Sequence, residues 1–128
     1  MIGIDTNLLV RLFIEDNQIQ TYKALKLIKS QKNVFVSTVV FCETIWVLQS
    51  RYHFNKTQLM GAIEHILKIH ELHIEHNDAI WLAFNEFQDI DADFSDCLIG
   101  TVAKLYQCDM VATFDKNAAK SKNFKLLQ

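Results

Sequence analysis

Residues 1–15 of the chain read MIGIDTNLLVRLFIE, which predicts a short apolar strand over residues 1–5 and a helix over residues 7–15. Asp5, at the end of this strand, is the only charged residue among the first ten. Similar strand and helix patterns follow toward the C-terminus. Strands that alternate with helices of this length are typical of a parallel sheet covered by helices on both faces. The opening stretch therefore predicts an α/β fold.

The remaining segments continue the alternation of strands and helices. No repeat, low-complexity stretch or Gly/Ser-rich linker interrupts it. Asn77 or Asp78 is the expected N-cap of one helix. Helices are predicted over residues 18–31, 39–51, 55–69, 77–87 and 94–106, strands over 34–37, 72–75, 110–114 and 124–127, with a last helical turn before the final strand. We expect a three-layer α/β/α sandwich with a central, mostly parallel sheet.

Composition limits the class of protein. The chain has 128 residues, of which 50% are hydrophobic and 22% charged, with a formal net charge of -2 and no proline. These values predict a single globular domain over residues 1–128 and exclude intrinsic disorder. No apolar stretch approaches the roughly 20 residues of a membrane span, and the N-terminus lacks the basic start of a signal peptide. We expect a cytoplasmic protein.

The three cysteines, Cys42, Cys97 and Cys108, all stand in apolar surroundings. Their odd number and their spacing do not match a disulfide framework or a zinc site. We expect buried thiols in a reducing compartment.

Three carboxylates stand inside or directly after apolar runs. Asp5 ends the first strand, Glu43 is the only charged residue of VFVSTVVFCETIWVLQS over residues 34–50, and Asp115 follows MVATF. An unpaired carboxylate buried in such surroundings costs several kcal/mol, so it must be neutralised, paired or bound to a cation. Two simpler explanations remain: Asp5 could cap the helix that follows it, and Glu43 could pair with a basic residue of the core.

Two more acids, Asp93 and Asp96, lie in ADFSDCLIG at the start of a predicted helix. If the helix already includes Asp93, their spacing of three residues places both on one face. Alternatively, Asp93 is the N-cap and Asp96 is a first-turn acid favoured by the helix dipole.

The positions of these acids indicate a metal site. Ligands of parallel α/β sheets bind at the carboxyl ends of the strands, where Asp5 and Asp115 are predicted. A cluster of carboxylates without His or Cys favours Mg²⁺ or Mn²⁺, which prefer oxygen ligands. Such ions activate water and stabilise the leaving oxygen of a phosphodiester. The acids therefore predict metal-dependent phosphoryl chemistry.

Four blocks of the sequence resemble the acidic blocks of the PIN domain family, and most closely those of VapC-type toxins from toxin–antitoxin pairs. The blocks are MIGIDTNLLVRLF, STVVFCETIWVL, DADFSDCLIGTVA and MVATFDKNA, in this order over nearly the whole chain. The resemblance implies a PIN fold and a Mg²⁺- or Mn²⁺-dependent endoribonuclease. It also implies a cognate antitoxin protein and a homodimer.

Carried over by position, the family's acidic quartet corresponds to Asp5, Glu43, Asp96 and Asp115. The resemblance implies that these four are catalytic, and that they hold the metal together with Asp93. The polar residues that would orient them correspond to Thr6, Asn7 and Thr113. The chain departs from the family at Cys97 and Gly100, where alanine is usual, and at Lys116, where arginine is frequent. None of these departures replaces one of the acids.

The charge distribution is compatible with an RNA substrate. If the five candidate acids are set aside, ten of the 15 acidic residues remain, and the 13 basic residues outnumber them. Candidate RNA contacts are Arg11, Lys116 and Lys120, although lysine-rich segments also serve as solvated faces.

Three other functions compete with a toxin-type nuclease. The first is a housekeeping PIN nuclease in RNA processing. The second is a Mg²⁺-binding signalling module phosphorylated on aspartate, which would need paired acids after the first strand, where this chain has Thr6 and Asn7. The third is an interaction module without nuclease activity.

Overall fold

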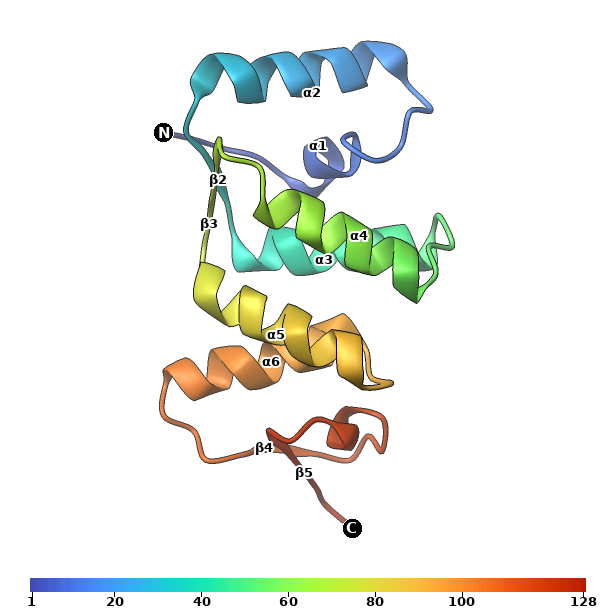
Figure 1. Cartoon of the computed structure of the whole chain (residues 1–128), viewed down its shortest axis with the longest axis vertical. Helices are drawn as coiled ribbons and strands as arrows, with labels where there is room; N and C mark the ends of the chain where they lie inside the picture. Colours follow the sequence, from blue (N-terminus) through green and yellow to red (C-terminus); the bar gives the residue numbers. More distant parts are fainter. The chain divides into compact units, whose positions relative to one another are not determined.

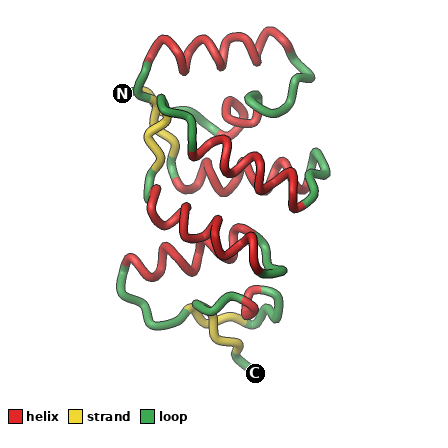
Figure 2. The backbone as a smooth tube through the Cα atoms, in the orientation of Figure 1, coloured by secondary structure: helices red, strands yellow, loops and turns green.

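The structure is a computed structural model that describes all 128 residues (Figure 1). Contacts divide the chain into two compact units, Met1–Glu75 and His76–Gln128. The single domain expected over residues 1–128 stays a prediction. Each unit combines helices with short parallel strands (Figure 2).

The N-terminal unit contains three strands and four helices. Its sheet has the order β1-β2-β3, and both pairs of strands are parallel, with Ile2 beside Val34 and Val34 beside Leu72. Two helices lie in each connection between consecutive strands. The elements are β1 (Ile2–Gly3), α1 (Thr6–Val10), α2 (Gln18–Gln31), β2 (Val34–Val36), α3 (Thr38–Ser50), α4 (Lys56–Leu67) and β3 (Leu72–Ile74).

The helices of this unit begin where short polar side chains can cap them. Asn17, Ser37 and Asn55 each accept a hydrogen bond from a backbone amide in the first turn of α2, α3 and α4. Such caps satisfy amides that have no partner within the helix. Asn55 and Gln58 form a reciprocal capping box. The core of the unit consists of side chains that are fully or almost fully buried: Leu9, Val34, Val36, Phe41, Ile45, Leu48, Ile63 and Ile66.

The first helix is shorter than the sequence predicts. α1 ends at Val10, whereas the expected helix continues to residue 15. After its end, three backbone hydrogen bonds span three residues instead of four. The amides of Arg11, Leu12 and Phe13 donate them to the carbonyls three residues earlier. Such i→i−3 bonds are typical of the last turn of a helix.

The C-terminal unit contains two long helices and a second parallel sheet. α5 (Asn77–Asp89) and α6 (Phe94–Leu105) lie side by side (Figure 1). They are followed by β4 (Val111–Thr113), the 3₁₀ helix η1 (Ala118–Lys120) and β5 (Phe124–Leu126), with β4 parallel to β5. The rings of Phe87 and Phe94 meet edge to face, with their centroids 5.8 Å apart.

The prediction that Asn77 or Asp78 is the N-cap of α5 is wrong. His76 occupies this position in a left-handed conformation, and its side chain does not cap the helix. Asp78 instead lies in the first turn, where a negative charge interacts favourably with the helix dipole.

The predicted α/β class with parallel strands is confirmed. The strands are divided between a three-stranded and a two-stranded sheet, whereas the sequence predicts one central sheet. No helix combines the length and the apolar character that a membrane crossing requires. Of the three cysteines expected to be buried, Cys97 is buried, Cys42 is half-buried and Cys108 is exposed.

Candidate active site

Asp5 lies at the junction of β1 and α1 and is the N-cap of that helix. Its Oδ1 accepts a hydrogen bond of 3.0 Å from the amide of Leu8. The capping alternative raised by the sequence is therefore correct for one oxygen of this carboxylate. Oδ2 makes no hydrogen bond within the protein, so capping leaves that oxygen available to a ligand.

Thr6 connects this junction with α3. Its hydroxyl donates a hydrogen bond to Oε1 of Glu43. The backbone explains the contact, because α1 packs against α3. Of the two polar residues expected to orient the acids from here, Thr6 therefore contacts one. Asn7 is exposed and makes no hydrogen bond to any of them.

Three of the acids are more exposed than the sequence suggests. The apolar runs around Asp5, Glu43 and Asp115 predict buried carboxylates, yet all three are exposed. For Glu43 the reason is the periodicity of α3. Phe41, Thr44, Ile45 and Leu48 turn to the core, whereas Glu43 and Trp46 lie on the exposed face. The core base suggested as a partner for Glu43 is also wrong, because Glu43 forms no salt bridge.

Asp93 and Asp96 begin α6 in the C-terminal unit. Asp93 occupies the N-cap position, but its side chain makes no capping hydrogen bond. Its carbonyl oxygen instead accepts from the amides of Asp96 and Cys97, at 3.1 and 3.2 Å. The Asp93 carboxylate is exposed and makes no hydrogen bond to the first turn of α6.

The environment of Asp96 raises the pKa of its carboxyl above the ordinary value of 3.8. Partial burial is the largest cause, followed by the negative charges of Asp93 and then of Asp115. A hydrogen bond with the backbone of Asp93 lowers the pKa in part. Burial and like charges both disfavour the ionised form. The carboxylates of Asp93 and Asp115 thus both lie within electrostatic reach of Asp96.

Asp115 follows β4 and begins a tight turn. Its Oδ1 accepts a hydrogen bond of 2.8 Å from the amide of Asn117, and Oδ2 makes none. The hydroxyl of Thr113 accepts from the amide of Asp115 at 3.0 Å. Thr113 therefore contacts the backbone of Asp115 and not its carboxylate, and its role as an orienting residue stays a prediction.

Asp5, Glu43 and Asp115 share one feature. In each carboxylate one oxygen is held by a donor of the protein, and the other oxygen has no protein partner. A carboxylate held in this way has a fixed orientation and can still bind a cation.

No group of three or more His, Cys, Asp or Glu side chains is arranged to hold a metal ion. The chemistry of the donors nevertheless fits a hard cation. All five candidates offer carboxylate oxygens, which Mg²⁺ and Mn²⁺ prefer. The charges of Asp93 and Asp115 repel an ionised Asp96, and a divalent cation would offset this repulsion.

The three candidate RNA contacts differ in whether they already form an ion pair within the protein. Arg11 is half-buried and forms an ion pair with Asp16. Lys120 forms an ion pair with Asp91, with 3.4 Å between Nζ and Oδ2. Lys116, which directly follows Asp115, is exposed and forms no salt bridge. It is the only one of the three without an ion pair.

Comparison with known families identifies the architecture. A model of the PIN domain matches residues 2–123, which is nearly the whole chain and includes all five candidate acids. The chain belongs to the PIN domain family. PIN domains are generally metal-dependent nucleases, so membership indicates a nuclease-type function. A search of curated proteins found no match to the chain.

Within this PIN domain, sequence reasoning missed Asn117, whose amide fixes Asp115. A signal was present, because an aspartate often accepts a hydrogen bond from the amide two residues later in a turn. It also missed the buried Ser121 and Asn123. Nothing in their local pattern distinguishes them from ordinary loop residues.

Proposed function

We propose that this PIN domain is a Mg²⁺- or Mn²⁺-dependent endoribonuclease in which Asp5, Glu43, Asp96 and Asp115 are the catalytic acids. The proposal is supported by family membership and by one structural observation. Asp5, Glu43 and Asp115 are each held by one carboxylate oxygen, and their second oxygen is unpaired. Purely structural acids would gain more from pairing with a base, yet none of the four forms a salt bridge.

Each residue has a defined task in this proposal. Asp5, Asp96 and Asp115, with Glu43 and Asp93 contributing, would hold the cation. When bound, the cation activates water and offsets negative charge on the phosphate. The Thr6 hydroxyl fixes Oε1 of Glu43, and the amide of Asn117 fixes Oδ1 of Asp115. These bonds keep the carboxylates oriented before the substrate arrives.

Asp96 must be ionised in this proposal. A carboxyl must lose its proton to ligate a metal. Because the pKa of Asp96 is raised, this proton is lost at a higher pH than usual. The ionised form, favoured by a bound cation, is the form that the proposal requires.

We further propose that the protein is the toxin of a type II toxin–antitoxin pair and acts as a homodimer inhibited by its antitoxin. Support comes from the four sequence blocks, which resemble those of VapC-type toxins. The adjacent reading frame tests this directly. A toxin requires a neighbouring frame for a small protein with a DNA-binding N-terminus, and that protein should co-purify with the chain and abolish cleavage. A neighbouring frame of another kind favours a housekeeping nuclease.

The activity itself is tested with purified protein and a mixed-sequence RNA. We expect cleavage with Mg²⁺ or Mn²⁺, none in EDTA, and internal cuts that yield fragments and not mononucleotides. A single-stranded DNA of the same sequence is the matched control. Incubation with acetyl phosphate examines the signalling alternative, since a phospho-aspartate adduct without RNA cleavage would reverse the assignment.

A further inference from the structure

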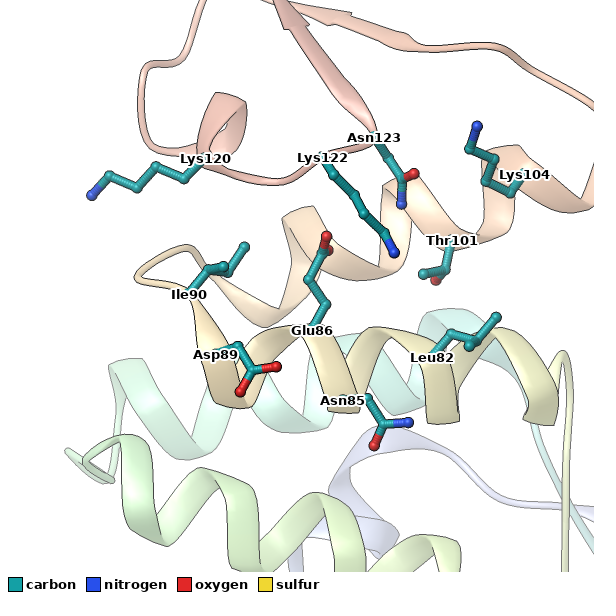
Figure 3. A pocket seen from close by; sticks show the side chains of 10 residues that line it. All are labelled: Leu82, Asn85, Glu86, Asp89, Ile90, Thr101, Lys104, Lys120, Lys122 and Asn123. Carbon is teal, nitrogen blue, oxygen red and sulfur yellow. The ribbon is translucent and has the colours of Figure 1, made fainter.

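A cavity in the C-terminal unit is separate from the candidate acids. It has a volume of about 590 Å³, and none of the five acids lines it. Cavities of roughly 300–1,000 Å³ are typical of small-ligand sites. Its walls come from α5, the end of α6 and the segment from η1 to β5 (Figure 3). The lining residues are Leu82, Asn85, Glu86, Asp89, Ile90, Thr101, Lys104, Lys120, Lys122 and Asn123.

Asn123 directs an unpaired polar group into this cavity. The residue is only 6% exposed, and its side-chain carboxamide makes no hydrogen bond within the protein. Figure 3 shows the carboxamide pointing toward α6 and the cavity. Its backbone is fixed on both sides, because its carbonyl accepts from Val111 at 2.8 Å and its amide donates to Ser121 Oγ at 3.3 Å. Among the buried side-chain polar atoms only Arg11 Nε lacks a partner, so the carboxamide of Asn123 is still reached by solvent and can pair with a ligand that enters the cavity.

Lys122 adds an unpaired positive charge beside this carboxamide. Its ammonium group points into the cavity next to Asn123 (Figure 3) and forms no ion pair or hydrogen bond. The two other lysines of the wall are engaged and point away. Lys104 donates to the carbonyl of Asp109 at 3.2 Å, and Lys120 pairs with Asp91.

Glu86 supplies acceptors on the opposite wall. Ser121, which is 2% exposed, donates to its carboxylate, with Oγ 2.9 Å from Oε1 and 3.0 Å from Oε2. This contact fixes the carboxylate, which points toward Lys122 in Figure 3 without forming a salt bridge to it. Carboxylate oxygens have about four lone-pair positions, so Glu86 can accept further hydrogen bonds. Leu82 and Ile90 provide apolar surface.

We propose that this cavity binds a guanine nucleotide. Guanine presents two neighbouring donors, N1–H and the N2 amino group, together with the acceptors O6 and N7. Glu86 offers acceptors for the first pair, and Asn123 and Lys122 offer donors for the second, a pairing that Lys commonly makes with guanine. Adenine lacks the neighbouring donors, so the carboxylate favours guanine.

The site does not depend on the nuclease assignment, since binding at it is measured without cleavage. The nucleotide can be free, or it can be one residue of an RNA strand. Calorimetric titration of the full chain in EDTA with GMP, AMP and inorganic phosphate tests the first source. A short oligouridylate with one guanosine, compared with the same strand lacking it, tests the second.

We expect GMP or the guanosine-containing strand to bind, with AMP and phosphate at least about tenfold weaker, as the loss of charged hydrogen bonds implies. Lys122→Met and the isosteric Asn123→Asp should each weaken binding about tenfold or more. Lys125→Met is the matched control, because Lys125 is exposed on β5 and does not line the cavity. Circular dichroism checks that each variant is folded, and Glu86→Gln provides a second variant that can still accept from Ser121.

Three results would overturn the proposal. The first is the absence of binding by GMP and by the guanosine-containing strand. The second is equal binding of GMP and AMP. The third is binding that Lys122→Met and Glu86→Gln leave unchanged. Stronger binding of the strand than of GMP identifies RNA as the source, and the reverse identifies the free nucleotide.

Discussion

The hydroxyl of Thr6 donates a hydrogen bond to Oε1 of Glu43, a residue 37 positions later in the chain. This bond connects the start of α1 with the exposed face of α3. It fixes one oxygen of a carboxylate that would otherwise move freely on the helix surface. Glu43 has no salt bridge, so Thr6 is its only partner in the protein.

Thr6→Val removes this hydroxyl and keeps the shape of the side chain. We expect kcat/KM for RNA cleavage to fall about tenfold, because hydrogen bonds to charged groups contribute roughly 1.5–3 kcal/mol at most. Thermal stability should change little, since the bond is exposed. Thr6→Ser should restore the rate, and Thr57→Val on the exposed face of α4 is the control. An unchanged rate in Thr6→Val would show that Glu43 needs no orientation.

The pKa of Asp96 predicts a pH dependence of stability. In the unfolded chain this carboxyl has its ordinary pKa of 3.8, and folding raises it. The native state thus binds the proton more tightly, so the contribution of Asp96 to stability is fully present below pH 3.8 and is lost as the pH rises through the raised pKa.

Asp96→Asn removes this titration while keeping the size of the side chain. In EDTA, we compare the free energy of unfolding of the variant with that of the wild type. The value of the variant minus the value of the wild type should increase as the pH rises from 3 through the raised pKa, and it should be constant at higher pH. Urea denaturation at a series of pH values measures this. A difference that is independent of pH would mean that folding does not change the pKa of Asp96.

Gly100 and Gly61 form a matched pair for packing. A Cβ at Gly100 would lie 2.9 Å from the Cβ of Asn123 and 3.2 Å from the ring of Phe124, whereas one at Gly61 would meet nothing within 4 Å. Gly100→Ala should destabilise the protein by about 1–3 kcal/mol. Gly61→Ala should stabilise it by about 0.5–1 kcal/mol, as expected in a helix. Denaturant titration measures both, and equal effects would contradict the close approach of Asn123 to α6.

Binding of the metal is measurable without any substrate. A ligand that binds only the folded state stabilises it by about 2.7 kcal/mol at a concentration of 100 times its Kd. Mg²⁺ or Mn²⁺ should therefore raise Tm, and Asp115→Asn should reduce this increase. Asp78→Asn is the control, because Asp78 lies in the first turn of α5 and is not a candidate ligand. An equal increase in both variants would place the metal elsewhere.

The sequence predicts most elements of the fold within a few residues. Apolar periodicity marks α2, α4 and α6, because one face of each helix must be buried, whereas α3 is marked by an almost continuous apolar run. It fails at the end of α1, where apolar residues continue beyond Val10 although the helical hydrogen bonds tighten and end. The pairing of the strands also cannot be predicted from the sequence, because each strand contains only two or three residues.

The site shows a similar division. The identity of the acids could be read from charges inside apolar runs, but their exposure could not, because the run around Glu43 mixes both faces of α3. The Thr6–Glu43 and Asn117–Asp115 hydrogen bonds depend on side-chain placement. Gly100 stands where the resemblance leads us to expect alanine, and the reason is visible only in the structure, where Asn123 and Phe124 pack against it.

The central claim is that the acidic quartet performs metal-dependent RNA cleavage, and Asp96→Asn tests it most directly. The rate of Mg²⁺-dependent cleavage of a mixed-sequence RNA is compared among the wild type, Asp96→Asn and the control Asp109→Asn, each shown to be folded by circular dichroism. We predict that Asp96→Asn abolishes cleavage and Asp109→Asn retains it. A folded Asp96→Asn variant that cleaves RNA at the wild-type rate would contradict the account.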